Sequence, residues 1–83
     1  MINKRIHRFI EWFGWCGVIA IFVAYALLSF ELIIADGILY PLLNLFGGLA
    51  ILIDAWVDRN YQPVALNALW ALVALIAIFR LFL

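Results

Sequence analysis

The stretch that decides the fold is Asn44-Leu-Phe-Gly47-Gly48-Leu-Ala-Ile51-Leu-Ile-Asp54-Ala55, in the middle of the second of three apolar segments. At helical spacing, its small and polar residues fall at i, i+3, i+4, i+7, i+10 and i+11 and therefore share one face. The opposite face carries Leu45, Leu49 and Leu52. This pattern predicts an apolar helix whose small, polar face forms a seam with neighbouring helices.

The composition is that of a chain surrounded by lipid. Of its 83 residues, 71% are hydrophobic and 12% are charged, whereas roughly 45–50% of residues are apolar in soluble domains. Five Lys and Arg balance five Asp and Glu, so no basic surface is present to bind nucleic acid. We expect the lipid bilayer as the main partner and no nucleic acid.

The hydrophobic runs predict a single membrane domain, residues 1–83, with helices at about 9–30, 38–57 and 63–81. The first run would be about 33 Å long as a helix, enough to cross a hydrocarbon core of about 30 Å. It also resembles a signal peptide, with Ala24-Tyr25-Ala26 as a possible cleavage site, but it is longer than the usual apolar region of such peptides. The predicted fold class is all-α, an integral membrane three-helix bundle.

Two short polar stretches connect the predicted helices. Asp36 is placed to cap the second helix, and Pro41 and Pro63 fall where a helix begins. The N-terminal tail and the second connection hold four Lys or Arg, whereas the first connection and the C-terminus hold only Arg80. The positive-inside rule then places the N-terminus in the cytoplasm and the C-terminus outside.

Polar side chains inside the predicted spans form two layers at different depths. Tyr25 and Ser29 lie near the level of Asn44, and Asp54 lies near the level of Asn67. These layers have two interpretations: hydrogen bonds that hold the helices together, worth about 0.5–2 kcal/mol each, or the lining of a solute or ion path. Asp54 favours the second, because an ionisable group at that depth points to function, unless it lies close enough to the interface to be hydrated.

Other residues of the spans suggest close helix packing and a place for a ligand. Small residues predict that the helices approach closely, and we assign this packing role to six of them: Gly14, Gly17, Gly47, Gly48, Ala71 and Ala74. Alanines of the third helix outside this set are available for contact with another subunit. Trp70, near mid-membrane, suits either packing or stacking on a bound ring.

The residues of known catalytic and metal centres are missing. His7, in the basic tail, is the only histidine, so neither a Ser-His-acid arrangement nor a cluster of metal ligands can be assembled. Gly47-Gly48 lacks the lysine of a phosphate-binding loop. We expect no enzyme, no cofactor and no metal.

Several short motifs resemble a family of small, uncharacterised bacterial membrane proteins with three hydrophobic segments. They are Gly14-Trp-Cys-Gly17, Ala24-Tyr25-Ala-Leu-Leu-Ser29, Tyr40-Pro-Leu-Leu-Asn44-Leu-Phe-Gly47 and Pro63-Val-Ala-Leu-Asn67-Ala-Leu-Trp70. The resemblance implies a location in the bacterial inner membrane and brings no established activity.

A more remote resemblance is to one triple-helix bundle of the half-sized sugar transporters, the SemiSWEETs, and to the small membrane domain of some lipid A biosynthesis proteins. In SemiSWEET-like proteins, two bundles enclose a substrate site lined by Asn and Trp, which here implies Asn67 and Trp70. The first predicted helix lacks the Pro-Gln motif of that superfamily.

Two functions of different classes follow from these features. The first is an oligomeric transporter or channel for a small polar solute, with Asn44, Asn67 and Trp70 beside its path. We expect a homo-oligomer, because one bundle of three spans is too small to enclose a ligand. The alternative is a non-catalytic structural or accessory subunit that packs against a larger membrane complex.

Overall fold

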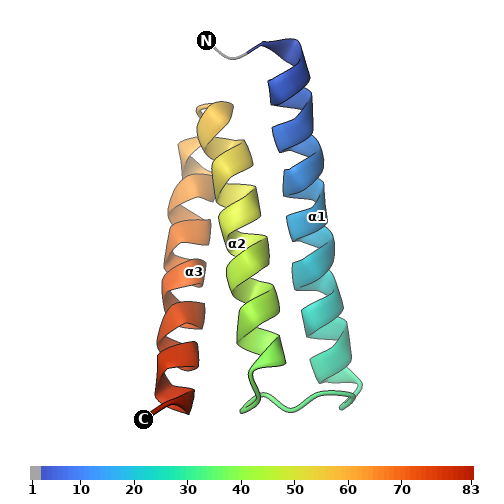
Figure 1. The fold of residues 1–83 in the computed structure, drawn as a ribbon, viewed down its shortest axis with the longest axis vertical. Coiled ribbons are helices and arrows are strands. Elements are labelled where there is room, and N and C mark those ends of the chain that lie inside the picture. The colour runs from blue at the N-terminus through green and yellow to red at the C-terminus, as the bar shows by residue number, and fades with distance from the viewer. Residues whose placement is uncertain (1–2) are drawn as a thin grey trace.

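The computed structural model describes residues 3–83, which form three helices and no strands (Figure 1). The helices are α1 (Lys4–Ser29), α2 (Leu39–Val57) and α3 (Tyr61–Leu81). Each is long and apolar enough to cross a membrane. The prediction of an all-α, three-helix chain is confirmed, and the helices begin at Lys4, Leu39 and Tyr61.

The three helices lie in a row with α2 in the middle (Figure 1). α2 packs against both neighbours, whereas within residues 3–83 no Cα of α1 lies within 8 Å of a Cα of α3. One end of the row, here called the His7 end, holds the start of α1 and the α2–α3 connection. The Arg80 end holds the α1–α2 connection and the C-terminus (Figure 1).

The helices begin in different ways. Asn3 caps α1, since its Oδ1 accepts a hydrogen bond of 2.8 Å from the backbone N–H of Ile6. The N-cap of α2 is Ile38, without a side-chain hydrogen bond, so Asp36 does not cap this helix as expected; it lies two residues too early. Pro41 and Pro63 are each the third residue of their helix, where a backbone N–H would have no partner within the helix.

Helices α1 and α2 both end in a Schellman motif, which reverses the chain within a few residues. Glu31 and Arg59 take the left-handed conformation, with φ of 62° and 56°. In each case the backbone N–H of the next residue bonds back into the last turn of the helix. The Leu32 N–H, for example, donates to the Leu27 carbonyl oxygen at 2.8 Å. Glycine is the usual residue at such a position, and another residue there costs about 1–2 kcal/mol.

The seam between α1 and α2 depends on two facing glycines. A methyl group placed on Gly17 would lie 2.7 Å from the Gly47 carbonyl oxygen and 2.8 Å from the Ala50 Cβ. A methyl group on Gly47 would lie 2.7 Å from the Gly17 carbonyl oxygen and 2.5 Å from the Ile21 Cγ1. Any side chain at either position would therefore push the two backbones apart.

The same seam continues toward the His7 end. A methyl group on Gly14 would lie 2.6 Å from the Asp54 Oδ2, so the Asp54 side chain occupies the space that this glycine leaves. The rings of Phe13 of α1 and Phe46 of α2 also meet across this seam, edge to face, with centroids 5.6 Å apart. This edge-to-face geometry is a favourable one for aromatic pairs.

The seam between α2 and α3 is looser. Ala71 and Ala74 are buried in it, at 7% and 6% exposure. A methyl group on Gly48 would meet the Asn67 carbonyl oxygen at 3.5 Å and the Ala71 Cβ at 3.8 Å, which are ordinary contact distances. Among the described residues, no large side chain is fully buried, so close backbone packing and not a bulky core holds the helices together.

The two adjacent glycines of α2 provide a matched test of these seams. We expect Gly47→Ala to destabilise the fold by about 1–3 kcal/mol, because the added methyl group overlaps α1. Gly48→Ala is expected to leave stability unchanged or to raise it by up to about 1 kcal/mol, because the methyl group fits and alanine is the better helix former. Thermal unfolding of both variants in the same detergent measures the difference, and equal losses would contradict the close contact at Gly47.

Candidate functional site

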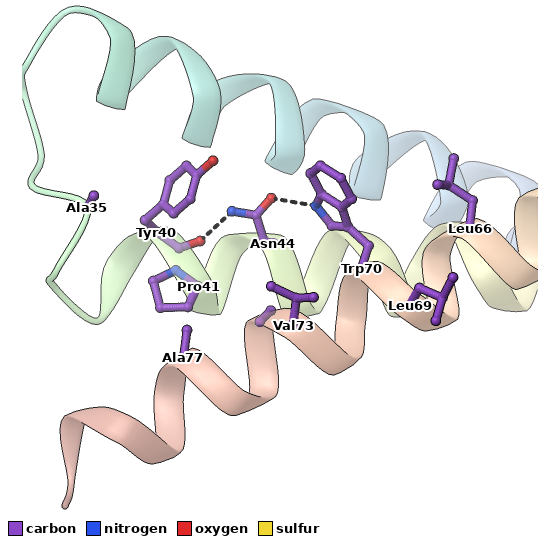
Figure 2. A pocket seen from close by; sticks show the side chains of 10 residues that line it. Ala35, Tyr40, Pro41, Asn44, Leu66, Leu69, Trp70, Val73 and Ala77 are labelled. Carbon is purple, nitrogen blue, oxygen red and sulfur yellow. Dashed lines mark hydrogen bonds between the residues drawn. The ribbon is translucent and has the colours of Figure 1, made fainter.

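The candidate site is a groove between α2 and α3, with a volume of about 430 Å³ (Figure 2). It is open on one side, since Trp70 and Leu66 in its wall are 48% and 61% exposed. Most of its lining is apolar. The lining residues are Ala35, Tyr40, Pro41, Asn44, Leu66, Leu69, Trp70, Val73, Ala74 and Ala77.

The polar part of the groove is a chain of hydrogen bonds that joins α3 to α2. The Trp70 Nε1–H donates to the Asn44 Oδ1 at 3.1 Å, and the Asn44 Nδ2 donates to the Tyr40 carbonyl oxygen at 2.8 Å (Figure 2). Asn44 is buried, at 6% exposure. The bond to its own helix holds the amide in place, and the amide in turn orients the Trp70 indole in the wall of the groove.

Asn67 does not join this site. It is buried at 8% exposure, on the turn of α3 before Trp70. Its Nδ2 donates to the Pro63 carbonyl oxygen of its own helix at 2.8 Å, and it does not line the groove. Of the two residues that the remote resemblance implied, the structure thus places only Trp70 in the groove.

The other candidate pathway residues lie apart from the groove. Tyr25 and Ser29 are exposed on α1, and within residues 3–83 neither hydrogen-bonds to Asn44. The partner of Asn44 across a helix seam is instead Trp70. The side chain of Asp54 packs against Gly14 of α1, whereas Asn67 lies on α3.

A polar contact that the sequence does not reveal closes the His7 end. The His7 Nε2 lies 2.7 Å from the Asp58 Oδ1, which ties the second turn of α1 to the α2–α3 connection. Both side chains are more than 40% exposed, so water competes with this pair. Within the described chain, no three His, Cys, Asp or Glu side chains gather where they could hold a metal ion.

Sequence reasoning also missed Tyr40 and the apolar residues of α3 as groove lining. Their spacing contains the signal: Tyr40 precedes Asn44 by four residues, and Leu66, Leu69, Val73 and Ala77 lie three or four residues apart along one face. In a chain this apolar, however, every helix face shows similar spacing.

Comparison with known proteins identifies a family but no activity. Residues 10–83 match the sequence model of a family of uncharacterised proteins. The chain belongs to this family. The match confirms the expected resemblance to an uncharacterised family and covers nearly the whole chain. No curated protein and no solved structure matches, so the resemblance to SemiSWEETs and to lipid A biosynthesis domains gains no support.

A double-mutant cycle tests the Asn44–Trp70 hydrogen bond. We expect Asn44→Leu and Trp70→Phe to be non-additive, with a coupling free energy of about 0.5–1.5 kcal/mol, because either change alone removes the same bond. Unfolding in detergent measures all four proteins.

The same cycle with Asn67→Leu in place of Asn44→Leu serves as the control. Since Asn67 bonds within its own helix, its coupling to Trp70 is expected to be near zero. Equal coupling in the two cycles would show that the bond between helices does not act as described.

Proposed function

We propose that the protein spans the bacterial inner membrane three times and acts as a homo-oligomeric transporter or channel, with its solute path beside the groove of α2 and α3. The proposal includes an N-terminus in the cytoplasm, as the distribution of Lys and Arg predicts. The single observation that carries it is the groove itself. Asn44 and Trp70 come from different helices, meet in its wall, and leave hydrogen-bonding capacity beside an open volume.

The remaining hydrogen-bonding capacity sets the kind of solute. Within residues 3–83 the Tyr40 hydroxyl has no hydrogen-bond partner, and the Asn44 amide uses only one of its two N–H groups. The rest of the wall is apolar. A solute that combines one or two polar groups with an apolar body fits this lining better than a fully hydrated polar one.

An oligomer is part of the proposal because the groove is open. A single chain leaves the Trp70 side of the groove exposed to its surroundings, so a second copy is needed to separate a solute from lipid. Two copies that enclose a solute between them are also what the remote resemblance to SemiSWEETs implied.

Flux into liposomes tests the proposal. Purified protein is reconstituted, and uptake is measured for a sugar, a monovalent ion and a fluorescent phospholipid whose headgroup crosses the bilayer. We expect at least one of the three to move faster than in protein-free liposomes. Asn44→Leu is expected to reduce that flux about 10-fold or more, whereas Asn67→Leu, outside the groove, leaves it within about 2-fold. Equal effects of the two changes would refute a path beside Asn44.

The alternative is an accessory subunit of a larger membrane complex. It is favoured by the row of helices: within residues 3–83, α1 and α3 each pack on α2, and no Cα of one lies within 8 Å of a Cα of the other, which leaves a side of each open to another protein. On α3 this side includes the exposed Ala65 and Ala68, which permit close approach. Gly17 does not contribute, because the α1–α2 seam already uses it. No flux of any solute, together with a fixed partner retained in mild detergent, would favour this alternative.

A further inference from the structure

The groove of α2 and α3 does not end at Tyr40. A second cavity of about 380 Å³ adjoins it at the Arg80 end of the molecule. The two cavities share Ala35, Pro41 and Ala77 in their walls. They therefore adjoin along the α2–α3 face, and their linings together run from Leu66 and Trp70 to Arg80.

The far end of this groove is charged. Arg80, in the last turn of α3, and Asp36, in the α1–α2 connection, both line the second cavity. Both are exposed, and in the part of the chain that the structure describes they form no ion pair with each other or with another residue. A cation and an anion thus line the same cavity at the groove mouth, and both are available to bind a ligand.

The length of the groove matches one leaflet of a bilayer. Ten residues of helix separate Trp70 from Arg80, a rise of about 15 Å. Half of a hydrocarbon core of about 30 Å is also about 15 Å. A chain that begins at Arg80 and runs along the apolar wall therefore ends near Trp70, at the depth where a lipid chain of that leaflet ends.

We propose that the groove binds a phospholipid with a primary ammonium in its headgroup, of the phosphatidylethanolamine kind. Arg80 donates to the phosphate, Asp36 accepts from the ammonium, and one acyl chain lies between α2 and α3 toward Asn44 and Trp70. This inference rests on the proposed function, because it names the class of solute that the same groove takes. Its polar head and apolar body match the charged mouth and the apolar wall.

The chemistry of the mouth predicts a preference among lipids. All common phospholipids carry the phosphate that Arg80 recognises, and hydrogen bonds between charged groups are roughly twice as strong as neutral ones. Only a primary ammonium also offers N–H donors to Asp36. Phosphatidylcholine has a cation without N–H groups, and phosphatidylglycerol has no cation. The carboxylate of Asp36 therefore selects phosphatidylethanolamine over both.

Native mass spectrometry of the full-length protein, equilibrated with equal amounts of these three lipids, tests the proposal. We expect one phosphatidylethanolamine per protomer to be retained about 10-fold better than the other two. Asp36→Asn is expected to abolish this preference, and Arg80→Gln to lower retention of all three lipids about 10-fold. Ala77→Phe, which fills the point shared by the two cavities, is expected to lower all three without changing their order.

Two matched controls lie outside the groove. Arg59→Gln removes an arginine at the His7 end, and Ala68→Phe enlarges an exposed alanine of the same helix; both are expected to retain lipid like the wild type. Circular dichroism checks that each variant is folded. Equal retention of the three lipids by the wild type would overturn the proposal. So would a wild-type level of retention in Arg80→Gln together with a wild-type lipid preference in Asp36→Asn. If the protein forms an oligomer that retains no lipid, and this oligomer dissociates in Ala77→Phe, the lipid proposal is overturned. The groove is then occupied by a second copy of the chain.

Binding and flux are separate readouts, so this inference and the proposed function fail differently. Selective retention without flux of any solute contradicts the transport proposal and leaves the lipid site standing. Flux without selective retention contradicts the lipid site alone.

Discussion

The close approach of α1 and α2 at Gly17 and Gly47 is the constraint on which the rest of the structure depends. At these positions the two backbones leave no room for a methyl group. This contact uses one side of α2, and Gly48 directs the neighbouring side toward α3. Because no large side chain among the described residues is fully buried, this fit of small residues supplies the specificity that a large core supplies in other folds.

The groove is a consequence of this arrangement. Within residues 3–83, α2 lies between its neighbours and no Cα of α1 lies within 8 Å of a Cα of α3, so the third side of a closed bundle is open. Among the described residues, the Trp70 indole is therefore the one group of another helix that hydrogen-bonds to Asn44, and the wall beyond them stays open. The same openness leaves room on one surface for a solute, a lipid chain or another subunit.

The sequence predicted which residues of α2 are buried in the seam. It did not predict which helix each of these residues contacts. Asn44, Gly47, Gly48 and Ala55 are all buried, as their shared spacing indicates. Spacing cannot assign the neighbour, because it shows which side of a helix is small and polar but not which helix packs against that side. The depth of Tyr25 suggested a partner for Asn44 on α1, whereas the amide bonds to α3. Likewise, the left-handed turn at Arg59 could not be foreseen, since glycine is the residue that marks such turns.

Disulfide cross-linking in native membranes tests most directly the claim that α2 lies between α1 and α3. In a Cys16→Ala background, Gly48→Cys with Ala71→Cys places the two Cβ atoms near the 3.8 Å of the glycine-to-alanine contact, a separation typical of disulfides. We predict a cross-link within the monomer for this α2–α3 pair and none for Ala24→Cys with Ala74→Cys, on α1 and α3. A cross-link of the second pair within one monomer, or its absence in the first, would contradict the account.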